Sequence, residues 1–184
     1  MPTHLVWFRA DLRVHDNIAL AAACRAKDAN VLALFVATPE QWRQHDMAPR
    51  QAALLRAYLT DLQHSLAGKG IPLIYKEVSD FAAQLQTVQE TCKQHNVTHL
   101  FYNYQYEFNE QQRDRQLEKM LEDVVCEGFD DSVMLAPGSV MTGNREMYKV
   151  FTPFKNAFIK RLKESLPECV AAPAARGEPL KDLS

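Results

Sequence analysis

The chain contains few glycines and cysteines, and both shortages exclude classes of site. Only 6 of its 184 residues are glycine, and the sequence has no G-x-G-x-x-G fingerprint, Walker-type loop or other glycine-rich phosphate cradle. The four cysteines are far apart in sequence and form no C-x-x-C pair, so neither a zinc ribbon nor a dithiol redox motif is expected. We interpret all of them as thiols without chemistry and expect no bound metal. The cysteines are Cys24, Cys92, Cys126 and Cys169.

An excess of positive charge and a long apolar run are also missing. The chain has 21 Lys and Arg against 23 Asp and Glu, a formal net charge of -2. A protein that holds nucleic acid by neutralising phosphates needs a basic face. No apolar run approaches the ~18–20 residues that span a bilayer, and the amino terminus lacks the regions of a secretory signal. We therefore expect a monomeric cytoplasmic protein without membrane contact.

Strand and helix patterns alternate over the first part of the chain, to about residue 131. The predicted strands are residues 4–9, 31–38, 73–78, 98–104 and 124–127. They are rich in β-branched and aromatic residues, as strands buried on both faces tend to be. Right-handed crossovers then predict an α/β fold with a doubly wound, Rossmann-like, five-stranded parallel sheet in the order 3-2-1-4-5.

Helices are expected between these strands, each with its own start signal. Asp16 is expected to cap the first helix, and Pro49 suits the first turn of the second. Ser79 or Asp80 opens the third, and the fourth is predicted to begin near Asn109.

The alternation ends after about Asp131. We expect residues 1–131 to form an α/β domain and residues 132–184 to form a linker segment containing one helix. Thr152 is its predicted N-cap, with Pro153 at the first helical position. Its apolar stripe consists of Phe154, Phe158 and Leu162. Because the sheet is already complete, this stripe predicts a partner in a second domain outside the chain.

A charged turn follows the first strand directly. Ligands of open α/β sheets bind at the carboxyl ends of strands, so this turn is a candidate site. It has no glycine, however, and alternating arginine and aspartate more often form internal salt bridges or a domain interface. We expect a structural role and assign no catalytic residue to the chain. The polar residues of the turn are Arg9, Asp11, Arg13, Asp16 and Asn17.

A second candidate lies in residues 101–110, at the end of the fourth strand, where aromatic rings stand beside amides and carboxylates. Asn109 with Gln112 reads as a capping box, which makes Glu110 a first-turn acid. Alternatively, Glu110 can accept the two adjacent N–H groups of a pterin in a forked pair. Both interpretations are compatible, because a capping turn also holds a ligand-facing acid rigidly.

Four blocks of sequence together resemble one family. The pattern W-F-R-x-D-L-R-x-x-D-N-x-A-L covers residues 7–20, and further blocks stand at 102–107, 125–131 and 147–154. They resemble the amino-terminal, antenna-binding domain of the DNA photolyase/cryptochrome family. The similarity is closest to bacterial folate-type deoxyribodipyrimidine photolyases, and it covers nearly the whole chain.

The resemblance implies a set of ligands and partners. In the family, an Asn-Glu pair and a histidine after the second strand hold the antenna 5,10-methenyltetrahydrofolate; here these residues are Asn109, Glu110 and His45. A carboxyl-terminal helical domain binds FAD and UV-damaged DNA and splits pyrimidine dimers as a carbon–carbon lyase. That domain lies outside this chain, so the resemblance implies that the chain alone is inactive.

Two other functions remain open at this point. A cryptochrome-like blue-light photoreceptor shares this domain, and the Asn-Glu pair does not separate it from a repair enzyme. A stand-alone adenine-nucleotide-binding α/β protein is the other alternative, although the sequence lacks its glycine-rich loop and H-x-G-H motif. The sequence also leaves open whether a deazaflavin replaces the folate as antenna, and which DNA lesion the enzyme repairs.

Overall fold

A computed structural model describes residues 1–178 and 180 of the chain. Its contacts divide these residues into two compact units. The first contains Met1–Phe129 together with the described residues from Val170 onward, and the second contains Asp130–Cys169. We describe each unit by itself.

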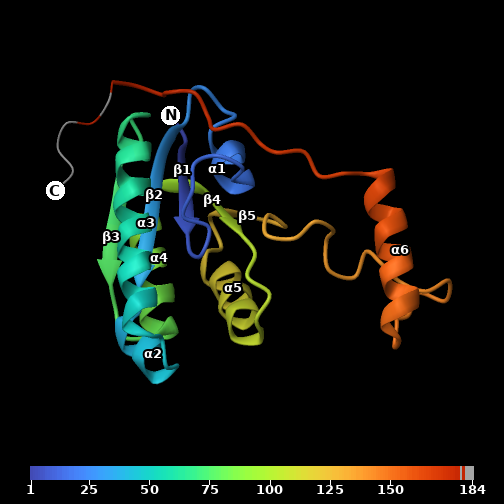
Figure 1. Cartoon of the computed structure of the whole chain (residues 1–184). Helices are drawn as coiled ribbons and strands as arrows, with labels where there is room; N and C mark the ends of the chain where they lie inside the picture. Colours follow the sequence, from blue (N-terminus) through green and yellow to red (C-terminus); the bar gives the residue numbers. More distant parts are fainter. Residues whose placement is uncertain (179, 181–184) are drawn as a thin grey trace. The chain divides into compact units, whose positions relative to one another are not determined.

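The first unit is built on a five-stranded sheet with the order β3-β2-β1-β4-β5 (Figure 1). Every neighbouring pair is parallel, which confirms the predicted doubly wound α/β fold and its strand order. β1 lies at the centre, and all six of its residues are buried. The strands are β1 Thr3–Phe8, β2 Asn30–Ala37, β3 Leu73–Glu77, β4 Val97–Asn103 and β5 Val125–Phe129.

Helices cover both faces of the sheet and bury two separate apolar clusters (Figure 1). Alternate residues of β1 supply the two clusters, because successive strand side chains point to opposite faces. Val6 and Phe8 pack with α1 and α3, whereas Leu5 and Trp7 pack with α4 and α5. The helices of this unit are α1 Ile18–Ala23, α2 Pro39–Gln44, α3 Pro49–Ala67, α4 Phe81–Gln94 and α5 Phe108–Met120.

Three of the predicted helix caps, those of α1, α5 and the helix of the second unit, are wrong by one or two residues. Asn17, not Asp16, caps α1, and its side chain accepts the Leu20 N–H at 2.9 Å. Asp16 instead adopts a left-handed conformation, with φ of 54°, and its carboxylate accepts the Val170 N–H at 3.1 Å. Asp80 caps α4, as one of the two predicted alternatives.

α5 begins one residue earlier than the sequence suggests. Its N-cap is Glu107, so Asn109 lies inside the first turn and the predicted capping box with Gln112 is wrong. The amide of Gln111 reaches back instead and donates to the Tyr106 carbonyl at 2.7 Å. Glu110 remains a first-turn acid, where the helix dipole favours negative charge.

The short helix α2 was not predicted at all. It has six residues, none of them buried, so no apolar period marks it in the sequence. Pro39 at its first position is its main local signal. Figure 1 shows α2 at the end of the sheet toward which the strand arrows of β1 and β3 point.

The second unit contains the helix α6, Phe151–Glu164. The predicted cap is wrong: Val150, in an extended conformation, precedes the helix, and Thr152 and Pro153 lie within its first turn. The ring of Phe154 packs edge-on against Tyr148 and at a tilt against Phe158, with centroid distances of 6.1 and 5.8 Å. No residue of α6 is buried within the described chain. The division into an α/β domain and an interdomain linker stays a prediction.

The described residues from Val170 onward belong to the first unit and form hydrogen bonds with its backbone. Arg176 donates side-chain hydrogen bonds to four carbonyls, those of Cys24, Ala26, Lys27 and Ala29, at 2.6–3.3 Å. Its own N–H bonds to the Lys69 carbonyl at 2.8 Å. We call the described residues 170–180 the returning strap.

The cysteines give a prediction about thiol chemistry. Burial raises the pKa of Cys92 to about 12 and the pKa of Cys126 to about 11. Since the thiolate is the nucleophile, both residues should react with iodoacetamide far more slowly than the exposed Cys169 at pH 8. Mass spectrometry of the alkylated protein checks this; equal labelling of Cys92 and Cys169 would contradict it.

Candidate ligand-binding site

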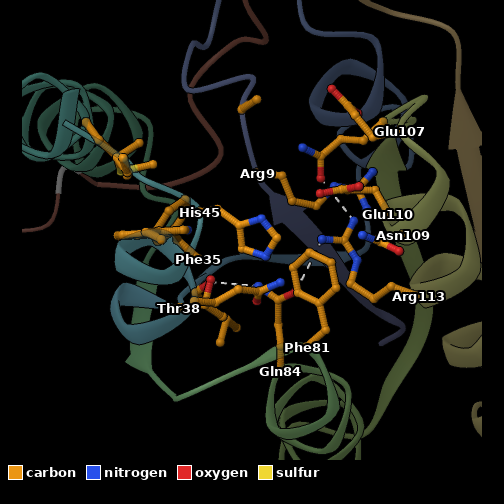
Figure 2. Close-up of a pocket in the computed structure, with 17 residues that line it drawn as sticks. Arg9, Phe35, Thr38, His45, Phe81, Gln84, Glu107, Asn109, Glu110 and Arg113 are labelled. Carbon is orange, nitrogen blue, oxygen red and sulfur yellow. Dashed lines mark hydrogen bonds between the residues drawn. The ribbon is translucent and has the colours of Figure 1, made fainter.

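A cavity of about 480 Å³ lies at the carboxyl ends of β1 and β2, beside the loop that follows β4 (Figure 2). The sheet order places β2 and β4 on opposite sides of β1, so this is the point where the strand order reverses. Doubly wound sheets bind their ligands at this place. Apolar side chains make up one part of the wall: Phe35, Val36, Trp42, Leu55 and Phe81.

All three residues predicted from the sequence line this cavity. His45 follows α2 directly, and Asn109 and Glu110 lie in the first turn of α5. Figure 2 shows His45 on one side of the pocket and the α5 residues on the other. Glu107, the N-cap of α5, is a further carboxylate on the wall. Their contact with a ligand stays a prediction.

Behind the wall lies a buried ionic cluster that the sequence did not reveal. Arg9 donates to both oxygens of Asp114 at 2.9 and 3.0 Å. Arg113 donates to Asp114 Oδ1 through Nε and Nη2 at 3.0 and 2.8 Å. All three residues are at most 7% exposed. Two cations therefore share one anion, and both arginines also line the cavity.

The sequence contained no clear signal for Arg113 and Asp114. α5 is strongly polar over most of its length, so a charged pair within it reads as a solvated face. The one sequence feature that puts Arg113 and Asp114 on the buried face of the helix is their distance from the apolar Leu117. Residues three and four positions apart share a helix face. Gln84 is also buried and on the cavity wall, but it lies on α4, where a single uncharged polar residue beside the apolar stripe gives no sign of burial.

The polar residues of the charged turn after β1 form several hydrogen bonds within the first unit, and their predicted structural role stays a prediction. Asp11 accepts the backbone N–H of Arg9 at 2.9 Å and the side-chain amides of Asn17 and Asn103 at 3.1 and 2.6 Å. Arg13 donates to the Asp16 carbonyl at 2.8 Å. The bonds of Asp11 tie the end of β1, where Arg9 lines the cavity, to the cap of α1 and to the end of β4.

Burial dominates the electrostatics of this region. It lowers the pKa of Arg113, an effect opposed by the charge of Asp114 and increased by the like charge of Arg9. The negative charge of Glu110 also favours the charged guanidinium. Nearby, burial and then a hydrogen bond to Glu118 raise the pKa of Tyr102, so this phenol stays neutral.

The described part of the chain offers no group of three or more His, Cys, Asp or Glu side chains that could hold a metal ion. Within the same residues, every helix is too short or too polar to cross a membrane. The cavity itself combines aromatic faces with a few convergent polar groups, a composition typical of sites for small organic ligands.

The family model for DNA photolyase matches residues 4–174 of this chain. The chain belongs to the DNA photolyase family. A deoxyribodipyrimidine photo-lyase of Salmonella typhimurium is 68% identical over 176 residues, which is 96% of this chain and 37% of that protein. The Escherichia coli deoxyribodipyrimidine photo-lyase is 65% identical over the same length and coverage.

Solved structures of this family share the fold. A cryptochrome of Synechocystis aligns with a TM-score of 0.80 and 25% identity over 97% of this chain and 38% of its own. A class III photolyase of Agrobacterium tumefaciens aligns with a TM-score of 0.70 at 20% identity over 99% of this chain and 37% of its own, which supports the fold alone. The chain thus spans about 37% of the length of the Salmonella and Escherichia photolyases.

Proposed function

We propose that this chain is the antenna-binding domain of a light-driven DNA-repair enzyme, a deoxyribodipyrimidine photolyase, and that its cavity binds methenyltetrahydrofolate. One observation carries the proposal: His45, Asn109 and Glu110 come from two separate elements and line one cavity at the strand ends. The high identity to photolyases over almost the whole chain supports the enzyme class.

The residues of the cavity fit a folate. Its pterin ring carries a 2-amino-4-oxo edge with two adjacent N–H donors, and the Glu110 carboxylate can accept both. Trp42 and Phe81 offer apolar faces for the flat ring. The cavity volume of about 480 Å³ lies within the usual range for small-molecule sites.

The protein's own residues bind and orient the ligand, and none of them touches a reacting bond. A bound folate absorbs light and passes the excitation to a flavin. The first turn of α5 holds Glu110 on rigid helix backbone, so the ring would keep one angle and one depth. His45 closes the opposite side of the cavity.

The remaining parts of the enzyme belong to a longer protein in this proposal. A carboxyl-terminal domain would bind FAD and UV-damaged DNA and would complete the wall of the folate cleft. The length of the relatives supports this, since the chain covers little more than a third of them. We further propose that the whole protein acts as a cytoplasmic monomer and that this chain alone repairs no DNA.

A binding titration tests the proposal. In the full-length protein, Glu110→Gln should weaken methenyltetrahydrofolate binding by about tenfold or more, because the amide replaces one acceptor with a donor. Equilibrium dialysis, followed by the absorbance of the folate, measures the dissociation constant. Glu122→Gln, at an exposed position just after α5, is the matched control. Equal affinity in the two variants would remove Glu110 from the site.

A cryptochrome-like photoreceptor is the second candidate, because the Synechocystis cryptochrome shares this fold closely. Both proteins would bind the antenna in the same way. Illumination of the full-length protein with dimer-containing DNA separates them: dimer splitting supports the repair enzyme, and a light-reduced flavin without splitting supports the photoreceptor.

A further inference from the structure

Arg113 is held so firmly that it presents a fixed positive charge to the cavity. Its guanidinium donates to Asp114 twice, to Gln105 Oε1 at 3.0 Å and to Gln84 Oε1 at 3.3 Å. It also lies over the rings of Trp7 and Phe81, at 4.7 and 5.0 Å from their centroids. The residue is 4% exposed and cannot swing into solvent.

Arg113 follows Glu110 by three positions on α5, so the two side chains lie on one helix face. Both line the cavity, and their charges interact. The helix therefore offers a carboxylate acceptor next to a cationic N–H donor. The cluster behind it, two arginines with one aspartate, carries an excess positive charge that attracts an electron-rich atom.

A 4-oxo-pteridine is complementary to this pair. Its carbonyl oxygen stands beside the ring N–H and the 2-amino group that Glu110 would accept. Arg113 follows Glu110 on the same helix face, and its guanidinium would donate a hydrogen bond to that oxygen. A 2,4-diamino-pteridine has an amino group in place of the oxygen, and its donors would then oppose the donors of the guanidinium.

We propose that Arg113 is the specificity-determining residue of the cavity, and that it selects pteridines with a 4-oxo group over their 4-amino analogues. This inference rests on the proposed folate function. It adds a second recognition residue, Arg113, for the oxygen at position 4 of the ligand. The 4-amino analogue also lacks the ring N–H beside position 4, so Glu110 would bind it through the 2-amino group alone, and Arg113 adds a further discrimination at position 4 itself.

Folic acid and aminopterin test this, since they differ in the group at position 4 and in the ring N–H beside it, and the change of preference in Arg113 variants isolates the part that Arg113 contributes. Each competes with bound methenyltetrahydrofolate in the full-length protein. We expect the wild type to prefer folic acid by about tenfold. Arg113→Gln should reduce the preference by about threefold or more, and Arg113→Lys, which keeps the charge, should restore part of it.

The exposed Arg115→Gln, on the same helix, serves as the control and should keep the wild-type preference. Equal competition by the two compounds in the wild type would overturn the inference even if Arg113→Gln does not fold. A preference that stays at its wild-type value in Arg113→Gln would also overturn it. Failure of methenyltetrahydrofolate to bind the wild type would instead contradict the proposed function.

Discussion

Asp114→Asn should lower the free energy of unfolding of the α/β unit by about 3–5 kcal/mol. The carboxylate is bonded to both Arg9 and Arg113, and all three side chains are buried. Asparagine has nearly the same shape, so it creates no cavity. It leaves two buried cations without their shared anion, and water cannot replace that charge.

Urea unfolding, followed by far-ultraviolet circular dichroism at pH 7, measures the loss. Asp123→Asn is the matched control, because Asp123 is exposed and lies outside the helices and strands. That variant should stay within about 0.5 kcal/mol of the wild type. If Asp114→Asn were as stable as the control, the ionic cluster would not hold α5 against the end of β1.

Arg176→Ala should release the returning strap and cost about 2–4 kcal/mol of stability. The guanidinium supplies the side-chain donors for carbonyls between Cys24 and Ala29, where α1 ends and the chain enters β2. Alanine removes all these bonds in one step. The backbone bond from Arg176 to the Lys69 carbonyl should then open more often.

Hydrogen exchange of the strap measures this opening. Amides of Arg176 and Leu180, which bond to the carbonyls of Lys69 and Ala67, should exchange faster in the variant. Arg25→Ala is the matched control, because Arg25 is an exposed arginine just after α1. Unchanged protection of the strap in Arg176→Ala would show that the backbone bonds hold it without the side chain.

The sheet could be predicted from the sequence because its central strands, β1, β2 and β4, are largely buried. Apolar, β-branched and aromatic runs that alternate with helical patterns indicate a parallel sheet, and right-handed crossovers favour a doubly wound order. Helix starts were harder to predict, since adjacent residues can serve as the cap: Asp16 and Asn17 are both good caps, and tertiary contacts decide between them. Val170, which lies 154 positions from Asp16, binds that carboxylate.

The candidate site was predictable only where its residues stand out locally. Glu110 and His45 could be named from the resemblance, and they do line one cavity. The cluster of Arg113 and Asp114 could not, because a charged pair on a polar helix gives no local sign of burial. Its partner Arg9 is more than a hundred residues away, and no periodicity reports such a contact.

Energy transfer tests the central claim most directly. In the full-length protein loaded with FAD and methenyltetrahydrofolate, the excitation spectrum of the flavin emission should contain the folate absorption band. Glu110→Gln should remove that band at a folate concentration that saturates the wild type, while Glu122→Gln keeps it. A folate band of equal height in wild type and Glu110→Gln would contradict the claim that this cavity holds the light-harvesting pigment.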